Sequence, residues 1–133
     1  MEQTFTRNID ALDQIFAFTG RFVEDERLNE NVAYSIDLAV EELFTNMVKY
    51  NTGTSKNIAI LIDREKDEVV LQLMDFDVEP FDPTSPEDID TDLPLEARKP
   101  GGLGLHLVKS VVDKITYEYK DRTMKVTVSK SLS

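Results

Sequence analysis

Residues 30–50 repeat an apolar side chain at every third or fourth position and include neither proline nor glycine. That spacing places the apolar residues on one face of a helix, namely Val32, Ile36, Ala39, Val40, Leu43 and Met47. A helix with one apolar face needs a second element against which that face is buried. The segment therefore predicts a long helix that packs on a surface supplied by the rest of the chain.

The other apolar patterns predict two further helices and a sheet. A helix over residues 8–26 begins with Asn8 as its N-terminal cap, and a third helix covers 105–112. Residues that favour β-structure dominate the predicted strands, which are 57–63, 69–75, 114–119 and 124–130, preceded by a short edge strand at 3–7. Helices grouped before and between hairpins predict an α+β fold with the helices on one face of the sheet.

The segment 79–102 differs in composition from the rest of the chain. It contains all five prolines, many acidic residues and few apolar ones. Such a composition disfavours regular structure, so we expect a long loop or lid over about residues 79–103. The length of 133 residues fits one domain, which we expect to cover residues 1–133.

Charge and composition exclude several classes of function. The chain contains no cysteine, and this excludes disulfide scaffolds, cysteine-based zinc sites and thiol chemistry. Its net charge is −11. The acidic balance disfavours binding to nucleic acid, because that affinity depends on neutralising phosphates. No apolar run approaches the length of a membrane span, and the first residues lack the apolar stretch of a signal peptide. We therefore expect a cytoplasmic protein with neither a membrane nor a nucleic acid as partner.

Two short patterns contain residue types that bind anions or metals. Glu42 and Asn46 are four residues apart in the predicted long helix, so their side chains project from one face. Taken alone, this spacing is equally typical of a solvated helix face. Residues 100–105, Pro-Gly-Gly-Leu-Gly-Leu, lead into the third helix, whose unpaired backbone N–H groups can bind a phosphate. Glycines at such a place are also typical of a hinge.

A third pattern lies where the second strand of the first hairpin ends. Asp75 and Asp77 precede the sequence Pro80-Phe-Asp-Pro83. A carboxylate at a strand end can accept a hydrogen bond from the amino group of a nucleobase, although aspartate and proline also form simple turns.

In their order along the chain, these patterns resemble the GHKL (Bergerat-fold) ATPases. The closest resemblance is to the anti-sigma regulatory factor branch, which contains small serine/threonine kinase-like proteins of bacterial partner switching. It covers essentially the whole chain, and its most specific part is residues 98–109, Arg-Lys-Pro-Gly-Gly-Leu-Gly-Leu-His-Leu-Val-Lys. The resemblance implies a two-layer sandwich, with helices on a mixed, mostly antiparallel sheet and with ATP and Mg²⁺ beneath the lid.

The resemblance also implies a role for each matching residue. Asn46 would hold the magnesium ion that bridges the phosphates, and Glu42 would be the general base or would orient it. The phosphates would be wrapped by the backbone of Gly101, Gly102, Gly104 and Leu105. Thr127 on the last strand would lie near the adenine, and Thr123 is close by in the sequence.

The adenine-binding pattern of the family is D-x-G-x-P-F-D-P, and here it departs from that form. The glycine is missing, and the segment is one residue longer if Asp75 is matched to the aspartate. Asp75 is the first choice for the adenine-binding residue because it closes the strand. Asp77 is the second choice.

These implications lead to one functional hypothesis and one alternative. The hypothesis is an ATP-binding anti-sigma regulatory factor that phosphorylates a serine or threonine of a STAS-type anti-sigma factor antagonist. It would alternate between this antagonist and a sigma factor or other target, and it would form a homodimer. The alternative is a non-catalytic, protein-binding regulator of the same fold that has lost efficient use of nucleotide.

Overall fold

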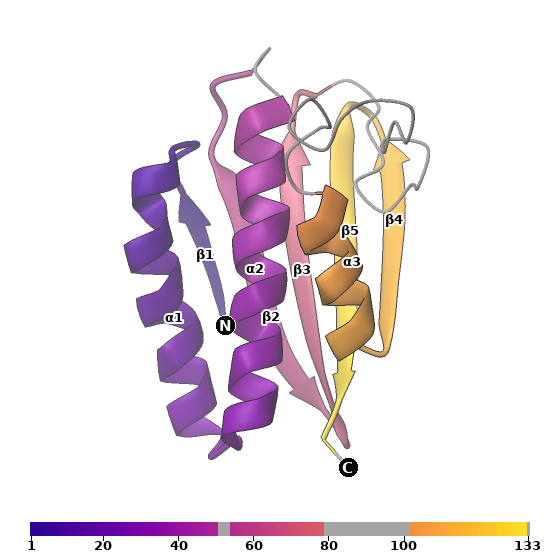
Figure 1. Ribbon diagram of the computed structural model, residues 1–133. Coiled ribbons are helices and arrows are strands. Elements are labelled where there is room, and N and C mark those ends of the chain that lie inside the picture. Colours follow the sequence, from indigo (N-terminus) through magenta and orange to yellow (C-terminus); the bar gives the residue numbers. More distant parts are fainter. Residues whose placement is uncertain (51–53, 79–101, 133) are drawn as a thin grey trace.

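The computed structural model describes residues 1–50, 54–78 and 102–132. The described segments form two layers, with three helices side by side on one face of a five-stranded sheet (Figure 1). In chain order the elements are β1 (Glu2–Phe5), a 3₁₀ turn (Ile9–Ala11), α1 (Leu12–Asp25), α2 (Glu30–Tyr50), β2 (Ile58–Glu65), β3 (Glu68–Phe76), α3 (Gly102–Val111), β4 (Lys114–Lys120) and β5 (Thr123–Ser131). The predicted α+β fold is confirmed.

The strand order in the sheet is β1-β2-β3-β5-β4, and every pairing between these described strands is antiparallel. β2 and β3 form one hairpin, and β4 and β5 form another. β5 is inserted next to β3, so the two hairpins join into one sheet. β1 and β4 are the edge strands. The expected edge position of the first strand is therefore confirmed.

α2 is the central helix and supplies much of the core. Its N-terminus is capped by Asn29, whose side-chain oxygen accepts a hydrogen bond of 2.9 Å from the backbone N–H of Val32. All six residues of the predicted apolar face are buried. They pack against the apolar residues of the sheet that face the helices, which include Ile58, Ile60, Ile62, Leu71, Leu73, Val126 and Val128.

The first helix differs in detail from its prediction. Asn8 caps its start, as expected, by accepting a hydrogen bond of 2.8 Å from Asp10 N, but the first turn is a 3₁₀ turn rather than α-helix. Ile9 is 40% exposed, whereas Phe18 is buried with its ring edge-to-face against Phe5, at 5.6 Å between ring centroids. Because the 3₁₀ turn has fewer residues per turn, it rotates Ile9 out of line with the apolar face of α1.

The lid expected over about residues 79–103 lies outside the described residues, except for its last two positions. Gly102 and Leu103 already belong to α3, which begins three residues earlier than the predicted 105–112. None of the helices in the described segments is long and apolar enough to cross a membrane.

Candidate functional site

Glu42 and Asn46 lie one turn apart in the C-terminal half of α2, as their spacing predicted. Asn46 is only 4% exposed, and Glu42 is partly buried. Asn46 Oδ1 and Glu42 Oε1 are both buried and have no hydrogen-bond partner among the described residues. A buried oxygen without a partner is costly, so two of them on one helix face indicate a place where a ligand or a metal ion supplies the missing interactions.

The environment of Glu42 favours its neutral form. Burial raises the pKa of this carboxyl group above its usual value, and the charge of neighbouring Glu41 raises it further, while Lys49 acts in the opposite direction. A carboxyl with a raised pKa exchanges a proton more readily near neutral pH, which is what a general base requires.

Asp75 ends the row of helix-facing residues on β3, after Val69, Leu71 and Leu73. Its side chain is 0% exposed, and both of its oxygens accept hydrogen bonds from the guanidinium of Arg7. Arg7 also donates to Met47 O, at 3.1 Å, and to Lys56 O, at 3.2 Å. The guanidinium therefore lies between Asp75 and the backbone of α2, at the residue that follows Asn46 in the sequence.

Arg7 is a residue of this site that no pattern in the sequence indicates. Its position two residues after β1 gives no signal in the sequence, because β1 and β3 are separated by β2 in the sheet. The long side chain of Arg7 reaches across to Asp75.

Asp77 lies two residues beyond Asp75 and has a backbone φ of 58°. Few residues other than glycine adopt this left-handed conformation, although aspartate is among the more tolerant ones. When Asp75 is matched to the aspartate of D-x-G, Asp77 falls on the glycine. The backbone therefore takes a conformation that suits glycine, which favours Asp75 over Asp77 as the matching aspartate. The Asp77 side chain is exposed and accepts a hydrogen bond of 2.9 Å from Arg122 Nε.

The N-terminus of α3 lies at the same end of the sheet as the last turns of α2 and the end of β3 (Figure 1). Gly101 lies outside the described residues. Gly102, Gly104 and Leu105 belong to the first turn of α3, where the backbone N–H groups of a helix have no intrahelical acceptor. The elements that carry Glu42, Asn46 and these glycines thus converge at one end of the molecule.

Thr127 is not brought together with these residues. In β5 the buried Met124, Val126 and Val128 face the helices, so Thr127 lies on the opposite face of the sheet. There it accepts a hydrogen bond of 3.5 Å from Gln72 Nε2. Thr123 alternates in the same way and lies on that face too.

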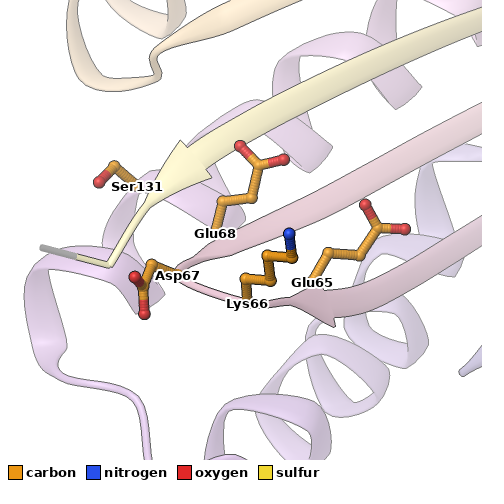
Figure 2. A pocket seen from close by; sticks show the side chains of 5 residues that line it. All are labelled: Glu65, Lys66, Asp67, Glu68 and Ser131. Atoms are coloured by element: carbon orange, nitrogen blue, oxygen red, sulfur yellow. The ribbon is translucent and has the colours of Figure 1, made fainter.

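An open hollow at the other end of the sheet has a different character. It is lined by Glu65, Lys66, Asp67, Glu68 and Ser131, which come from the β2–β3 turn and the end of β5 (Figure 2). Three carboxylates and one lysine give it a negative charge. It lies at the start of β3, whereas Asp75 lies near the end of this strand, so it is separate from the candidate site.

The described residues contain no group of three or more His, Cys, Asp or Glu side chains that could hold a metal ion. Asn46 Oδ1 and Glu42 Oε1 are the oxygen donors that the described part of the site offers. Magnesium fits this donor set, because it prefers oxygen and is commonly held by one or two protein oxygens together with phosphates. Asn46 Oδ1 is such an oxygen.

Comparisons with known proteins agree with this fold. The family model described as histidine kinase-like ATPase domain matches residues 5–130. A solved structure of the RsbU and RsbW domains of Rv1364c from Mycobacterium tuberculosis is similar with a TM-score of 0.71 at 16% identity, over 99% of this chain and 32% of that one. The chain thus spans about a third of that structure. The histidine kinase AdeS of Acinetobacter baumannii has a TM-score of 0.56 at 15% identity, over 100% of this chain and 68% of that one.

No curated protein matches the sequence. The family model, however, covers nearly the whole chain, and its fold is the one described above. The chain belongs to the histidine kinase-like (GHKL) ATPase domain family.

Proposed function

We propose that the protein binds ATP with Mg²⁺ and transfers the γ-phosphoryl group to a serine or threonine hydroxyl of another protein. The observation that carries this proposal is a pair of buried oxygens, on Glu42 and Asn46, that have no hydrogen-bond partner in the described part of the chain. An amide oxygen suits a magnesium ion, and a carboxylate oxygen suits the proton of a hydroxyl group. Membership of an ATPase domain family supports the use of ATP.

Each residue would contribute a separate part of the transfer. Asn46 Oδ1 would hold the magnesium ion, which when bound offsets the negative charge of the phosphates. The hydroxyl oxygen of the serine or threonine would form a bond to the γ-phosphorus, while the bond between this phosphorus and the bridging oxygen breaks and ADP leaves. Glu42 would accept the proton of the attacking hydroxyl. The raised pKa of Glu42 matches this role, since the carboxylate then takes up a proton more readily.

The phosphates would bind at the start of α3, to the backbone around Gly101, Gly102, Gly104 and Leu105. Unpaired backbone N–H groups at a helix N-terminus stabilise negative charge without a basic side chain. An acidic protein with a net charge of −11 can therefore hold one nucleotide.

The resemblance of residues 98–109 to anti-sigma regulatory factors supports a more specific role. The acceptor would be a STAS-type anti-sigma factor antagonist, and the regulated target a sigma factor or another protein. The protein would act in the cytoplasm as a homodimer.

A second candidate function is a non-catalytic regulator of the same fold. Two observations favour it: Asp75 is bonded to Arg7, and Asp77 carries a side chain where the family motif has glycine. Nucleotide binding therefore distinguishes the two candidates.

The deciding experiment is titration calorimetry with ADP and MgCl₂ on the wild type and on Asn46→Ala. We expect saturable binding by the wild type and at least about a tenfold weaker affinity in the variant, because Asn46 Oδ1 is the magnesium ligand. Asn31→Ala, in the exposed first turn of the same helix, is the matched control and should bind like the wild type. EDTA should remove most of the affinity. No binding by the wild type at millimolar nucleotide would refute the kinase function.

Phosphoryl transfer is measured separately, with radiolabelled ATP and a purified STAS-type antagonist. Glu42→Gln keeps the size of the side chain but cannot accept the proton, so we expect transfer to fall by about a hundredfold or more while ADP binding persists. Transfer at the wild-type rate would refute the role given to Glu42.

A further inference from the structure

The two ends of the candidate nucleotide site differ in how well their polar groups are already bonded. At the phosphate end, Glu42 Oε1 and Asn46 Oδ1 have no partner among the described residues. At the end of β3, both oxygens of Asp75 accept hydrogen bonds from Arg7, and the side chain is completely buried. Asp75 has no exposed surface, so a nucleobase could reach it only if Arg7 or the other residues packed around it moved.

Arg7 is firmly held in this position. Its side chain is 8% exposed, and besides the two bonds to Asp75 it donates to the backbone carbonyls of Met47 and Lys56. These bonds join the segment after β1, the helix α2, the segment before β2 and the strand β3. If the guanidinium moved away from Asp75, its bonds to Met47 O and Lys56 O would be disturbed as well.

A nucleobase cannot replace Arg7 on favourable terms. The 6-amino group of adenine is a neutral donor, so it returns one hydrogen bond to the carboxylate but does not supply the positive charge that a buried carboxylate requires. Breaking a buried ion pair costs more than one such hydrogen bond returns. The pair of Arg7 and Asp75 is therefore expected to persist when a nucleotide is bound.

Asp77, the other carboxylate at this end of β3, is bonded to an arginine as well. Arg122 Nε donates to Asp77 Oδ1 at 2.9 Å. The side chains of Arg122 and Asp77 are both about half exposed, so this ion pair is weaker than the buried pair of Arg7 and Asp75. Asp75 and Asp77 nevertheless each have an arginine as partner.

We propose that Arg7 removes selectivity for adenine from the site, because its bonds to Asp75 prevent this carboxylate from accepting a hydrogen bond from the 6-amino group of the base. The site then binds purine nucleotides through their phosphates and magnesium, and it does not distinguish an amino group from a carbonyl at position 6 of the base. This inference rests on the proposed nucleotide-binding function and concerns the base alone.

The test compares ADP with IDP, in which a carbonyl replaces the 6-amino group, by calorimetry on the wild-type protein with MgCl₂. We expect dissociation constants that agree within about threefold. One hydrogen bond to a charged acceptor changes a dissociation constant by about tenfold or more, so IDP binding weaker than ADP by more than threefold overturns the inference. If neither nucleotide binds, the proposed function fails as well. If both bind and Asn46→Ala weakens both, the proposed function stands whichever ratio is found.

A variant tests the part played by Arg7. Arg7→Lys keeps the positive charge that Asp75 needs, but lysine cannot bond to both carboxylate oxygens as the planar guanidinium does. We expect ADP to bind at least about threefold more tightly than IDP in this variant. Arg122→Lys, in the exposed pair, is the matched control and should keep the wild-type ratio. An unchanged ratio in a folded Arg7→Lys protein, checked by its melting temperature, would overturn the assignment.

Discussion

Glu42 makes the fold less stable in its charged state. Burial and the neighbouring Glu41 raise the pKa of its carboxyl group, so the folded protein favours the protonated form more than the unfolded chain does. As the pH rises from the usual value of 4.5 through the raised pKa, the folded protein retains a proton that the unfolded chain has already released. Stability therefore falls over this range, and the cost is fully present above it.

The substitution Glu42→Gln should remove this cost. We expect the variant to melt at a higher temperature than the wild type at about pH 8, and the gain to shrink as the pH approaches about 4, where Glu42 is neutral in both states. Thermal unfolding followed by circular dichroism across this pH range measures the difference. Glu65→Gln, an exposed residue of β2, serves as control and should show no such gain. A gain for Glu42→Gln that is independent of pH would contradict this explanation.

Residues of the candidate site could be predicted only where the functional side chains are close to one another in the sequence. The spacing of Glu42 and Asn46 places both side chains on one helix face, and each has a buried oxygen with no partner within residues 1–50, 54–78 and 102–132. The conformation of Asp77 and the contact from Arg7 to Asp75 could not be predicted in this way. The contact spans 68 positions and depends on how the strands are ordered in the sheet.

At the scale of elements, Arg7 joins the segment after β1 to α2 and β3. Its loss would remove the positive charge that is bonded to the completely buried Asp75. We expect Arg7→Met to lower the free energy of unfolding by about 3–5 kcal/mol, as measured by urea denaturation.

Arg64→Met tests whether burial causes this effect. Arg64 pairs with Glu26 at 3.9 Å with both side chains about 40% exposed, so its replacement should cost less than about 1 kcal/mol. Equal effects of the two substitutions would show that the buried pair has no special importance for the fold.

The elements themselves were largely predictable from local patterns. α2 has the predicted bounds, Glu30–Tyr50, because its apolar spacing is regular and uninterrupted. The strands differ from prediction by one or two residues at their ends. The predicted start of α3 at residue 105 is wrong, because Gly102 and Gly104 are helical here despite the low helix propensity of glycine. The position of β5 between β3 and β4 required the three-dimensional structure.

At the scale of the whole molecule, the net charge of −11 is a source of repulsion that the fold has to overcome. Salt screens this repulsion, so the melting temperature should rise by a few degrees between about 20 mM and about 300 mM NaCl. Thermal unfolding at constant pH tests this. A melting temperature that falls with salt would instead show that attractive ion pairs, such as that of Arg122 and Asp77, outweigh the net repulsion.

The turn between β4 and β5 joins these two strands and also contacts the chain just after β3. Asp121 and Arg122 both have positive φ values, and Arg122 O accepts a hydrogen bond of 2.9 Å from Val78 N, while the Tyr119 hydroxyl donates to Val78 O at 2.6 Å. The chain leaving β3 is therefore fastened on both sides to the second hairpin. A substitution in this turn would therefore shift the backbone that follows Asp75, although the turn itself contains none of the candidate site residues.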